Sequence, residues 1–259
     1  MESLLDKIVE IAYKAGSIAL TYQKNGFKSY KKGLNDIVTE ADLKVNAFLK
    51  KELLNLLPEA GWLSEESVDN KERLNKKMVW IVDPIDGTLQ FAKGTDQWVI
   101  SIALIEDKKP IMGVIYNPRK DQMFFAERCL GAFLNDFRIE NHYIERKKQI
   151  ILTTKSKKNF FRMFQYGLQK LFHIEQVGSL AYILALTSIG YASSCVTFKP
   201  ANEWDIAAGV LILKEAGCSF KILGNDDFVL NKENVYFKKG FFGANKTTFQ
   251  ILNKRLTKN

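Results

Sequence analysis

The stretch from Trp80 to Phe91, which reads W-I-V-D-P-I-D-G-T-L-Q-F, constrains the fold of this chain more than any other segment. Met78 to Val82 are apolar and partly β-branched, which predicts a buried strand that ends where the acids begin. Pro84 fixes its own φ and pushes Asp83 toward an extended conformation. We therefore expect Asp83 and Asp86 to be held in a defined relation just after a buried strand.

Gly87 and Thr88 follow directly and suit a phosphate, because glycine lets the backbone approach a ligand and threonine adds a hydroxyl where a helical turn could start. Carboxylates, together with the Ile85 carbonyl, are oxygen ligands that favour Mg²⁺ over zinc or copper. The alternative is an ordinary surface turn, since Asp, Pro and Gly are common turn residues.

Composition points to a globular protein with anionic partners. The 259 residues are 46% apolar and 26% charged, and 38 Lys and Arg against 29 Asp and Glu give a net charge of +9. Such a surface favours phosphorylated metabolites, nucleic acid or acidic lipid without choosing among them. Three widely spaced cysteines predict neither a disulfide framework nor a zinc site. With no signal peptide expected at the N-terminus, we predict a cytoplasmic protein.

A membrane span is the alternative interpretation of residues 178–198, which contain no charged side chain and are about long enough to cross a bilayer. Their Ser, Thr and Gly content favours a buried helix, a turn and a buried strand instead. We therefore expect no membrane association.

The first half predicts two helices and an antiparallel sheet. Apolar residues at helical spacing indicate a helix from Ser3 to about Asn25, and a second helix runs from Glu40 to Leu57. Thr39 and Asp42 fit a capping box, which alone would explain Asp42. Residues 64–77 are expected to form a loop and an exposed charged run, followed later by strands at 98–105, 111–117 and 122–127.

The second half alternates strand and helix, which predicts a layered α/β unit. Asp205 lies near the start of its last helix, where an acid complements the helix dipole. The expected elements are a strand at 150–153, a helix at 159–172, a strand at 174–177, a helix at 179–189, a strand at 192–198 and a helix from about Trp204.

Three motifs occur along the chain: S-E-E-S at 64–67, D-P-I-D-G-T at 83–88 and W-D-I-A-A-G at 204–209. Together they resemble the inositol monophosphatase family of Mg²⁺-dependent, lithium-sensitive phosphomonoesterases. The first is similar to that family's G-E-E-S loop, and the other two match its two signatures. The likeness covers nearly the whole chain. It implies an α/β (α+β) protein with the layered αβαβα sugar-phosphatase fold, in subdomains of residues 1–140 and 141–259.

The resemblance also implies a ligand set and two or three Mg²⁺ ions per site. Glu65, Asp83 and the Ile85 carbonyl would hold one Mg²⁺, and Asp83, Asp86 and Asp205 a second. Asp42 and Thr88, with Glu65, would act on the attacking water. The residues implied to contact the substrate are Asp86, Gly87, Thr88, Lys155, Ser179, Lys199 and Asp205, and Lys31 would add a positive charge.

The substrate is expected to be adenosine 3',5'-bisphosphate. Family members specific for inositol phosphate place a glutamate seven positions before Asp205, whereas this chain has Phe198. The runs at 153–156, 178–181 and 198–205 look closer to the 3'(2'),5'-bisphosphate nucleotidases, in which Lys155 or Lys199 would pair with the second phosphate. Inositol monophosphate remains the alternative.

Family likeness also implies a homodimer. A role from another class, binding RNA or the transcription complex, stays open because the chain is basic and some bacterial members bind the transcription machinery. It is less favoured, since we identify no interleaved aromatic and basic RNA-binding motif in the sequence.

Overall fold

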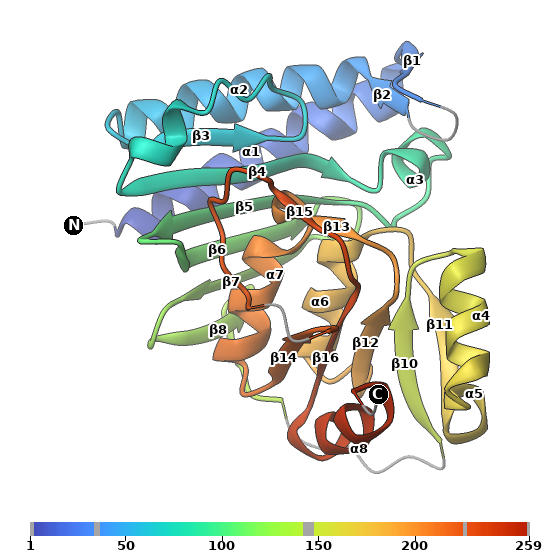
Figure 1. The fold of residues 1–259 in the computed structure, drawn as a ribbon. Coiled ribbons are helices and arrows are strands. Elements are labelled where there is room, and N and C mark those ends of the chain that lie inside the picture. The colour runs from blue at the N-terminus through green and yellow to red at the C-terminus, as the bar shows by residue number, and fades with distance from the viewer. Residues whose placement is uncertain (1–2, 34–36, 142–147, 225–226, 258–259) are drawn as a thin grey trace.

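Two β-sheets and three groups of helices form five layers in the computed structural model, which describes residues 3–33, 37–141, 148–224 and 227–257. One pair of helices lies along the first sheet, a second pair lies between the sheets, and three helices lie beyond the second sheet (Figure 1). The layered αβαβα fold predicted from the sequence is therefore confirmed. In this order the helices are α1 (Leu4–Asn25) and α2 (Glu40–Leu56), α6 (Leu180–Ser188) and α7 (Glu203–Glu215), and α4 (Lys157–Gln165), α5 (Leu168–Leu171) and α8 (Lys246–Leu256).

The first sheet has seven strands in their order along the chain. All neighbouring strands are antiparallel except β3 and β4, which are parallel. The strands are β3 (Gly61–Ser64), β4 (Met78–Asp86), β5 (Val99–Glu106), β6 (Lys109–Asn117), β7 (Gln122–Glu127), β8 (Gly131–Leu134) and β9 (Phe137–Ile139).

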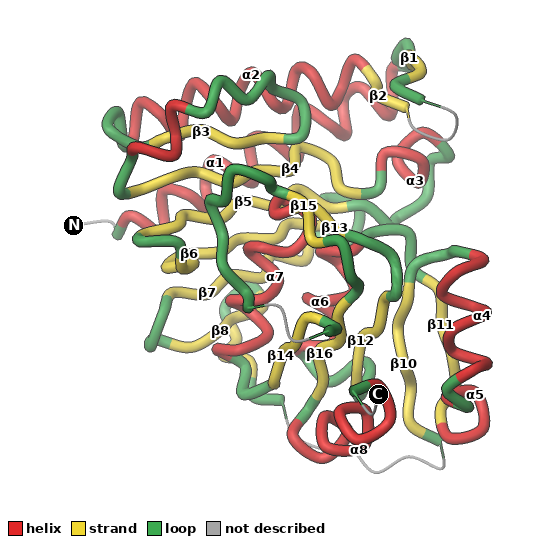
Figure 2. Tube along the Cα trace, in the orientation of Figure 1, coloured by secondary structure: helices red, strands yellow, loops and turns green. Residues whose placement is uncertain are grey.

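The second sheet has five strands, and its order β11-β10-β12-β16-β14 mixes parallel and antiparallel neighbours. The first three are parallel, as expected for strands joined by helices, and β16 runs antiparallel to both β12 and β14. These strands are β10 (Gln149–Thr153), β11 (Phe172–Gln176), β12 (Ser194–Thr197), β14 (Ser219–Ile222) and β16 (Phe241–Ala244). Figure 2 shows both sheets in yellow with red helices between them.

Two small ribbons and two short helices complete the fold. The ribbons pair β1 (Ser29–Lys31) with β2 (Ile37–Thr39), and β13 (Ala201–Asn202) with β15 (Tyr236–Phe237). The short helices are a 3₁₀ turn at Glu72–Asn75 and α3 (Thr88–Ala92).

Three apolar cores fill the spaces between the layers. The first lies between α1, α2 and one face of the first sheet. The second lies between the two sheets around α6 and α7, and the third lies beneath α4, α5 and α8. Because α6 and α7 pack on the first sheet, residues from both halves share the middle core. The division into subdomains at residue 140 therefore stays a prediction, and residues 142–147 lie outside the described part of the chain.

Sequence predictions about secondary structure are wrong at the helix of residues 159–172 and at Ser64, and also at the end of β4, which bears on the acidic motif. The helix predicted at 159–172 is broken, because Gly167 adopts φ 64° and the chain turns between α4 and α5. Residues 61–64 form strand β3 beside β4, whereas Ser64 was assigned to a loop. The uncharged segment 178–198 forms α6 and β12, as predicted, and no helix among the described residues has the length and apolarity to cross a bilayer.

Candidate active site

Five acidic side chains converge where β4 meets the starts of α2, α3 and α7. We call Asp42, Glu65, Asp83, Asp86 and Asp205 the acid cluster. Asp83 is 1% exposed, and its pKa is raised well above the ordinary value by burial and then by the charges of the four other members. A charge acts on a pKa in this way only at short range. The structure therefore brings the five acids into one neighbourhood.

An irregularity in β4 makes this convergence possible. Val79 and Ile81 face the middle core, whereas Trp80 and Val82 face the core beneath α1 and α2. Two residues three positions apart would point to opposite faces of a regular strand. The pairing of β4 with β5 shifts register between Asp83 and Asp86, and Ile85 faces the α1 and α2 side.

Asp86 consequently faces α6, on the same side of the sheet as Val79 and Ile81. The prediction that the strand ends before the acids was therefore wrong, since β4 continues through the motif to Asp86.

Asp86 is held by the start of α6. Its Oδ2 accepts hydrogen bonds from Ser179 Oγ at 2.7 Å and from the Ala181 N–H at 2.6 Å. Burial raises the pKa of Asp86 to about 6, and these hydrogen bonds oppose the shift. Ser179, which was expected to contact substrate, thus donates its hydroxyl proton to a member of the acid cluster.

Asp205 is the third helical residue of α7, where it forms a capping box with Asn202. Its Oδ2 accepts the Asn202 N–H at 2.7 Å. Burial and the neighbouring Asp86 raise the pKa of Asp205 well above its usual range, while Lys199 lowers it. The acid therefore caps its helix and also belongs to the cluster.

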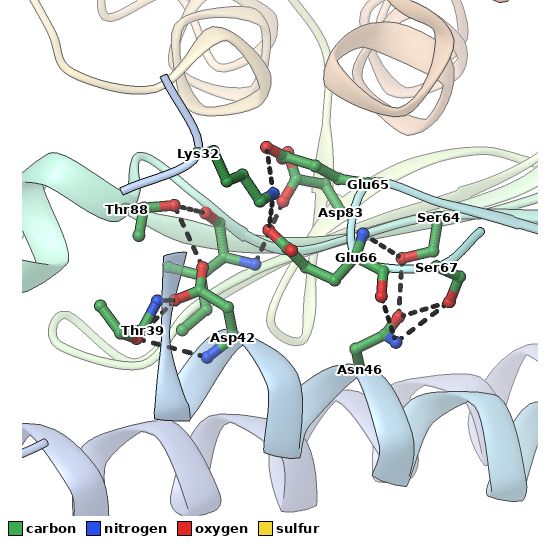
Figure 3. Close-up of polar contacts among 11 residues, drawn as sticks. Lys32, Thr39, Asp42, Asn46, Ser64, Glu65, Glu66, Ser67, Asp83 and Thr88 are labelled. Carbon is green, nitrogen blue, oxygen red and sulfur yellow. Dashed lines mark hydrogen bonds and ion pairs between the residues drawn. The ribbon is translucent and has the colours of Figure 1, made fainter. Parts of the chain in front are cut away.

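Asp42 and Thr88 form a hydrogen-bonded pair (Figure 3). Thr88 Oγ1 lies 3.1 Å from Asp42 Oδ1 and 3.2 Å from the Ile85 carbonyl oxygen. Asp42 also accepts hydrogen bonds from the Thr39 N–H and hydroxyl in a capping box. Burial nevertheless raises the pKa of Asp42. A threonine that gives its proton to a carboxylate keeps its oxygen lone pairs free to accept a proton from water.

A lysine from the N-terminal ribbon already neutralises part of this negative charge. Figure 3 shows Lys32 reaching the S-E-E-S segment, with its Nζ 3.4 Å from Glu65 Oε1 and 2.5 Å from Glu66 Oε1. The family resemblance pointed to Lys31, which lies at the exposed end of β1. The lysine that contacts Glu65 is thus the next one along the chain.

The acid cluster fits Mg²⁺ by its chemistry. Every expected donor is a carboxylate or carbonyl oxygen, the ligand type of hard cations. Burial, and then repulsion from neighbouring carboxylates, raises the pKa of Asp83 and of Asp205, and a divalent cation would offset that repulsion. Within the described residues, no three acidic, His or Cys side chains are already spaced to enclose one metal ion.

A pocket of about 320 Å³ opens beside Asp86, and we call it the acid-side pocket. Lys155 and Lys199, both expected to contact substrate, line this pocket, as does Lys93, which the sequence did not suggest. Phe198 instead stacks on Tyr166, with ring centroids 5.6 Å apart. The only signal that could have found Lys93 was its place one helical turn after the D-G-T motif.

Gly87 precedes α3 with φ 101°, and the first N–H groups of α3 have no acceptor within the helix. A Cβ at Gly87 would lie 2.9 Å from the Gln97 carbonyl oxygen. Glycine is therefore required here by both backbone conformation and space.

Comparison with known proteins places this geometry in a family. Residues 1–257 match the model described as "Inositol monophosphatase family". The chain belongs to this family. Its members are metal-dependent phosphomonoesterases that typically use Mg²⁺.

Similar proteins in the family have different activities. The chain is 32% identical over 244 residues to a fructose-1,6-bisphosphatase/inositol-1-monophosphatase of Thermotoga maritima, covering 93% of this chain and 91% of that protein. It is 28% identical over 247 residues to the 3'(2'),5'-bisphosphate nucleotidase CysQ of Aggregatibacter actinomycetemcomitans, covering 92% and 91%. The crystal structure of the extragenic suppressor protein suhB of Bartonella henselae superimposes with a TM-score of 0.85 at 30% identity, covering 98% of each chain.

Proposed function

We propose that this protein hydrolyses a small phosphomonoester that carries a second anionic group, with adenosine 3',5'-bisphosphate as the preferred substrate. The observation that carries the proposal is the acid-side pocket, in which Lys93, Lys155 and Lys199 stand beside Asp86. A substrate with one phosphate at the acid cluster would place its second anionic group among these lysines. The bisphosphate nucleotidase activity named for the similar CysQ protein agrees with this choice.

Mg²⁺ would be held by Glu65, Asp83 and the Ile85 carbonyl at one position and by Asp83, Asp86 and Asp205 at another. When bound, it supplies a Lewis acid that lowers the pKa of water and neutralises phosphate oxygens.

The chain's own residues orient the nucleophile. Thr88 Oγ1 gives its proton to Asp42 Oδ1 or to the Ile85 carbonyl, so its lone pairs can accept an O–H from the attacking water. The raised pKa of Asp42 makes that carboxylate a better proton acceptor. The water oxygen then forms a new bond to phosphorus as the ester P–O bond breaks. The proton of the water passes through Thr88 to Asp42, and the leaving oxygen takes a proton from solvent. Backbone N–H groups at Gly87 and Thr88 are the proposed donors to the phosphate oxygens.

Phosphate release from a panel of substrates tests this function. Adenosine 3',5'-bisphosphate, inositol monophosphate, fructose 1,6-bisphosphate and histidinol phosphate are compared with and without Mg²⁺. We expect Mg²⁺-dependent release and the highest kcat/KM for adenosine 3',5'-bisphosphate. A higher kcat/KM for inositol monophosphate would remove the nucleotide assignment while leaving the phosphatase, and no Mg²⁺-dependent release from any compound would remove both.

A second candidate function is RNA binding, and helix α4 favours it. The expectation that the sequence lacks interleaved aromatic and basic residues does not hold here, because α4 reads K-K-N-F-F-R-M-F-Q. Phe160, Phe161 and Phe164 are 71%, 65% and 67% exposed, and exposed aromatic rings beside lysines can stack with bases. An RNA affinity that falls steeply with salt and persists in a catalytically inactive variant would support this role. No binding near physiological salt would discard it.

A further inference from the structure

A second pocket, of about 310 Å³, lies in the outer layer of the molecule. We call it the outer pocket. It lies between α4, the end of α8 and the segment that leads into β16, and its walls include Tyr166 and Phe198. None of its lining residues lines the acid-side pocket. The outer pocket is therefore a cavity separate from the proposed active site.

Among the described residues, four cationic side chains and no acidic side chain line the outer pocket: Lys158, Arg162, Lys238 and Lys239. Across the described ranges of the chain, none of the four forms an ion pair with a carboxylate. Four cations around one cavity repel one another, and an anion would relieve that repulsion.

The positive charge of the chain is concentrated in the half that contains the outer pocket. Residues 141–259 carry 18 Lys and Arg against 8 Asp and Glu, a net charge of +10, whereas residues 1–140 carry 20 against 21, a net charge of −1. The entire positive surplus of the protein thus lies in the half that contains the outer pocket. An anionic ligand is attracted to this half before it makes any specific contact.

An aromatic wall restricts which anion fits. Tyr166 is partly exposed and stacks on the buried Phe198, with an angle of 15° between the ring planes. A rigid aromatic surface beside cations is the combination that binds a base and a phosphate together. A cavity of about 300 Å³ or more is the usual size of a small-molecule site. We propose that the outer pocket binds a soluble mononucleotide.

Adjacent residues and hydrogen bonds connect the walls of the outer pocket to those of the acid-side pocket. Phe198 lines the outer pocket, and the next residue, Lys199, lines the acid-side pocket. Asn159 of α4 ties the two walls together, because its Oδ1 accepts the Phe198 N–H at 2.8 Å and its Nδ2 donates to the Thr154 carbonyl at 3.0 Å. Thr154 also lines the acid-side pocket. A bound nucleotide would therefore alter the KM of the substrate through Lys199.

Calorimetric titration with adenosine 5'-monophosphate in EDTA tests binding without the catalytic reaction. We expect one saturable site per chain that the Lys238→Ala/Lys239→Ala variant weakens at least tenfold. The matched control, Lys170→Ala/Lys246→Ala, removes the same charge from the same half at exposed positions outside both pockets, and it should change Kd less than twofold. An equal loss in the control would show general charge attraction only and would overturn the proposal.

Further variants assign the ligand and the pocket. Tyr166→Leu should weaken the binding of the mononucleotide but not that of inorganic phosphate. Tyr166→Phe should bind the mononucleotide with the original affinity. Lys199→Ala should leave the binding of adenosine 5'-monophosphate in EDTA unchanged, because Lys199 does not line the outer pocket. This binding measurement stays valid even if the proposed catalytic function is wrong. Loss of the site in Lys199→Ala but not in the outer-pocket variant would overturn the proposal. Binding of a single-stranded RNA ten-mer with no saturable binding of the mononucleotide would overturn it as well.

Discussion

Ser179 Oγ donates a 2.7 Å hydrogen bond to Asp86 Oδ2, which joins the first residue before α6 to the acid at the end of β4. The same hydroxyl oxygen accepts the Tyr182 N–H at 2.9 Å and so caps α6. One side chain from the second half of the chain therefore performs two tasks, capping a helix and fixing the direction of a proposed metal ligand from the first half.

Replacing Ser179 by Ala should affect both tasks. Loss of the cap should lower the free energy of unfolding by about 1 kcal/mol. Loss of the hydrogen bond to Asp86 should raise the pKa of Asp86 further and lower the affinity of the protein for Mg²⁺. Ser156→Ala is the matched control, because Ser156 caps α4 and accepts the Asn159 N–H at 3.3 Å without contacting the acid cluster. Chemical denaturation and the Mg²⁺ dependence of activity measure the two effects. Equal Mg²⁺ dependence in both variants would contradict the positioning role.

Asp83→Asn should abolish Mg²⁺-dependent phosphate release, since Asp83 is assigned to both metal positions. The variant should remain folded without metal, because the substitution removes a buried charge that four other acids repel. Asp96→Asn provides a control at a half-exposed position where Asp96 pairs with Lys120 at 3.1 Å. Activity at saturating Mg²⁺ and circular dichroism are measured for both. An Asp83→Asn protein that keeps most of its activity would end the central assignment.

The metal-free protein should lose stability as pH rises. Asp86 has a pKa of about 6 in the folded state, above its ordinary value, so its contribution to stability is full below pH 3.8 and is lost as pH rises through 6. Burial and repulsion raise the pKa of Asp83 and Asp205 in the same direction.

Because Mg²⁺ would bind the carboxylates in their ionised form, the increase in Tm that it produces should be larger at pH 8 than at pH 5. Scanning calorimetry with Mg²⁺ or with EDTA at both values measures this difference. An identical increase at both pH values would show that the acid cluster does not bind the ion.

Gly87→Ala should destabilise the protein more than Gly94→Ala. Both glycines have positive φ, so each substitution carries a backbone cost of about 1–2 kcal/mol. Only at Gly87 would the new Cβ also meet neighbouring atoms, at 2.9 Å from the Gln97 carbonyl oxygen, whereas at Gly94 nothing lies within 4 Å. Urea denaturation compares the two. Equal losses would show that the close contact relaxes without cost.

Lys93→Ala should raise KM for adenosine 3',5'-bisphosphate at least several-fold and affect a substrate with one phosphate much less. The reason is that Lys93 lines the acid-side pocket but lies outside the acid cluster. Lys254→Ala removes a charge at an exposed position on α8 and serves as the control. Steady-state kinetics with both substrates decides the question. An equal change for both substrates would exclude recognition of the second anionic group by this lysine.

The elements with local signals could be predicted from the sequence. A cap at Ser3, a capping box at Thr39 and apolar periodicity mark α1 and α2, and alternation marks β5, β6 and β7. Four acids of the cluster were also found, because Glu65, Asp83, Asp86 and Asp205 belong to motifs whose order and context match the family. Asp42 lies outside these motifs and was included only because the resemblance implies it.

Elements defined by distant contacts were missed. Strand β3 is four residues long and is recognisable only through its parallel pairing with β4. Strands β14 and β16 also carried no prediction, and β16 is defined by its pairing with both β12 and β14 in the second sheet. Helix α8 was missed as well, although Asn245 caps it locally. The direction of Asp86 could not be predicted either, since it depends on a register shift against β5.

That register shift bears on any attempt to build such a centre into another scaffold. Grafting the D-P-I-D-G-T letters onto a flat, regular strand would send one carboxylate into each face of the host sheet, and the pair would never share an ion. A designer would have to transfer the register shift between β4 and β5 together with the ligand residues.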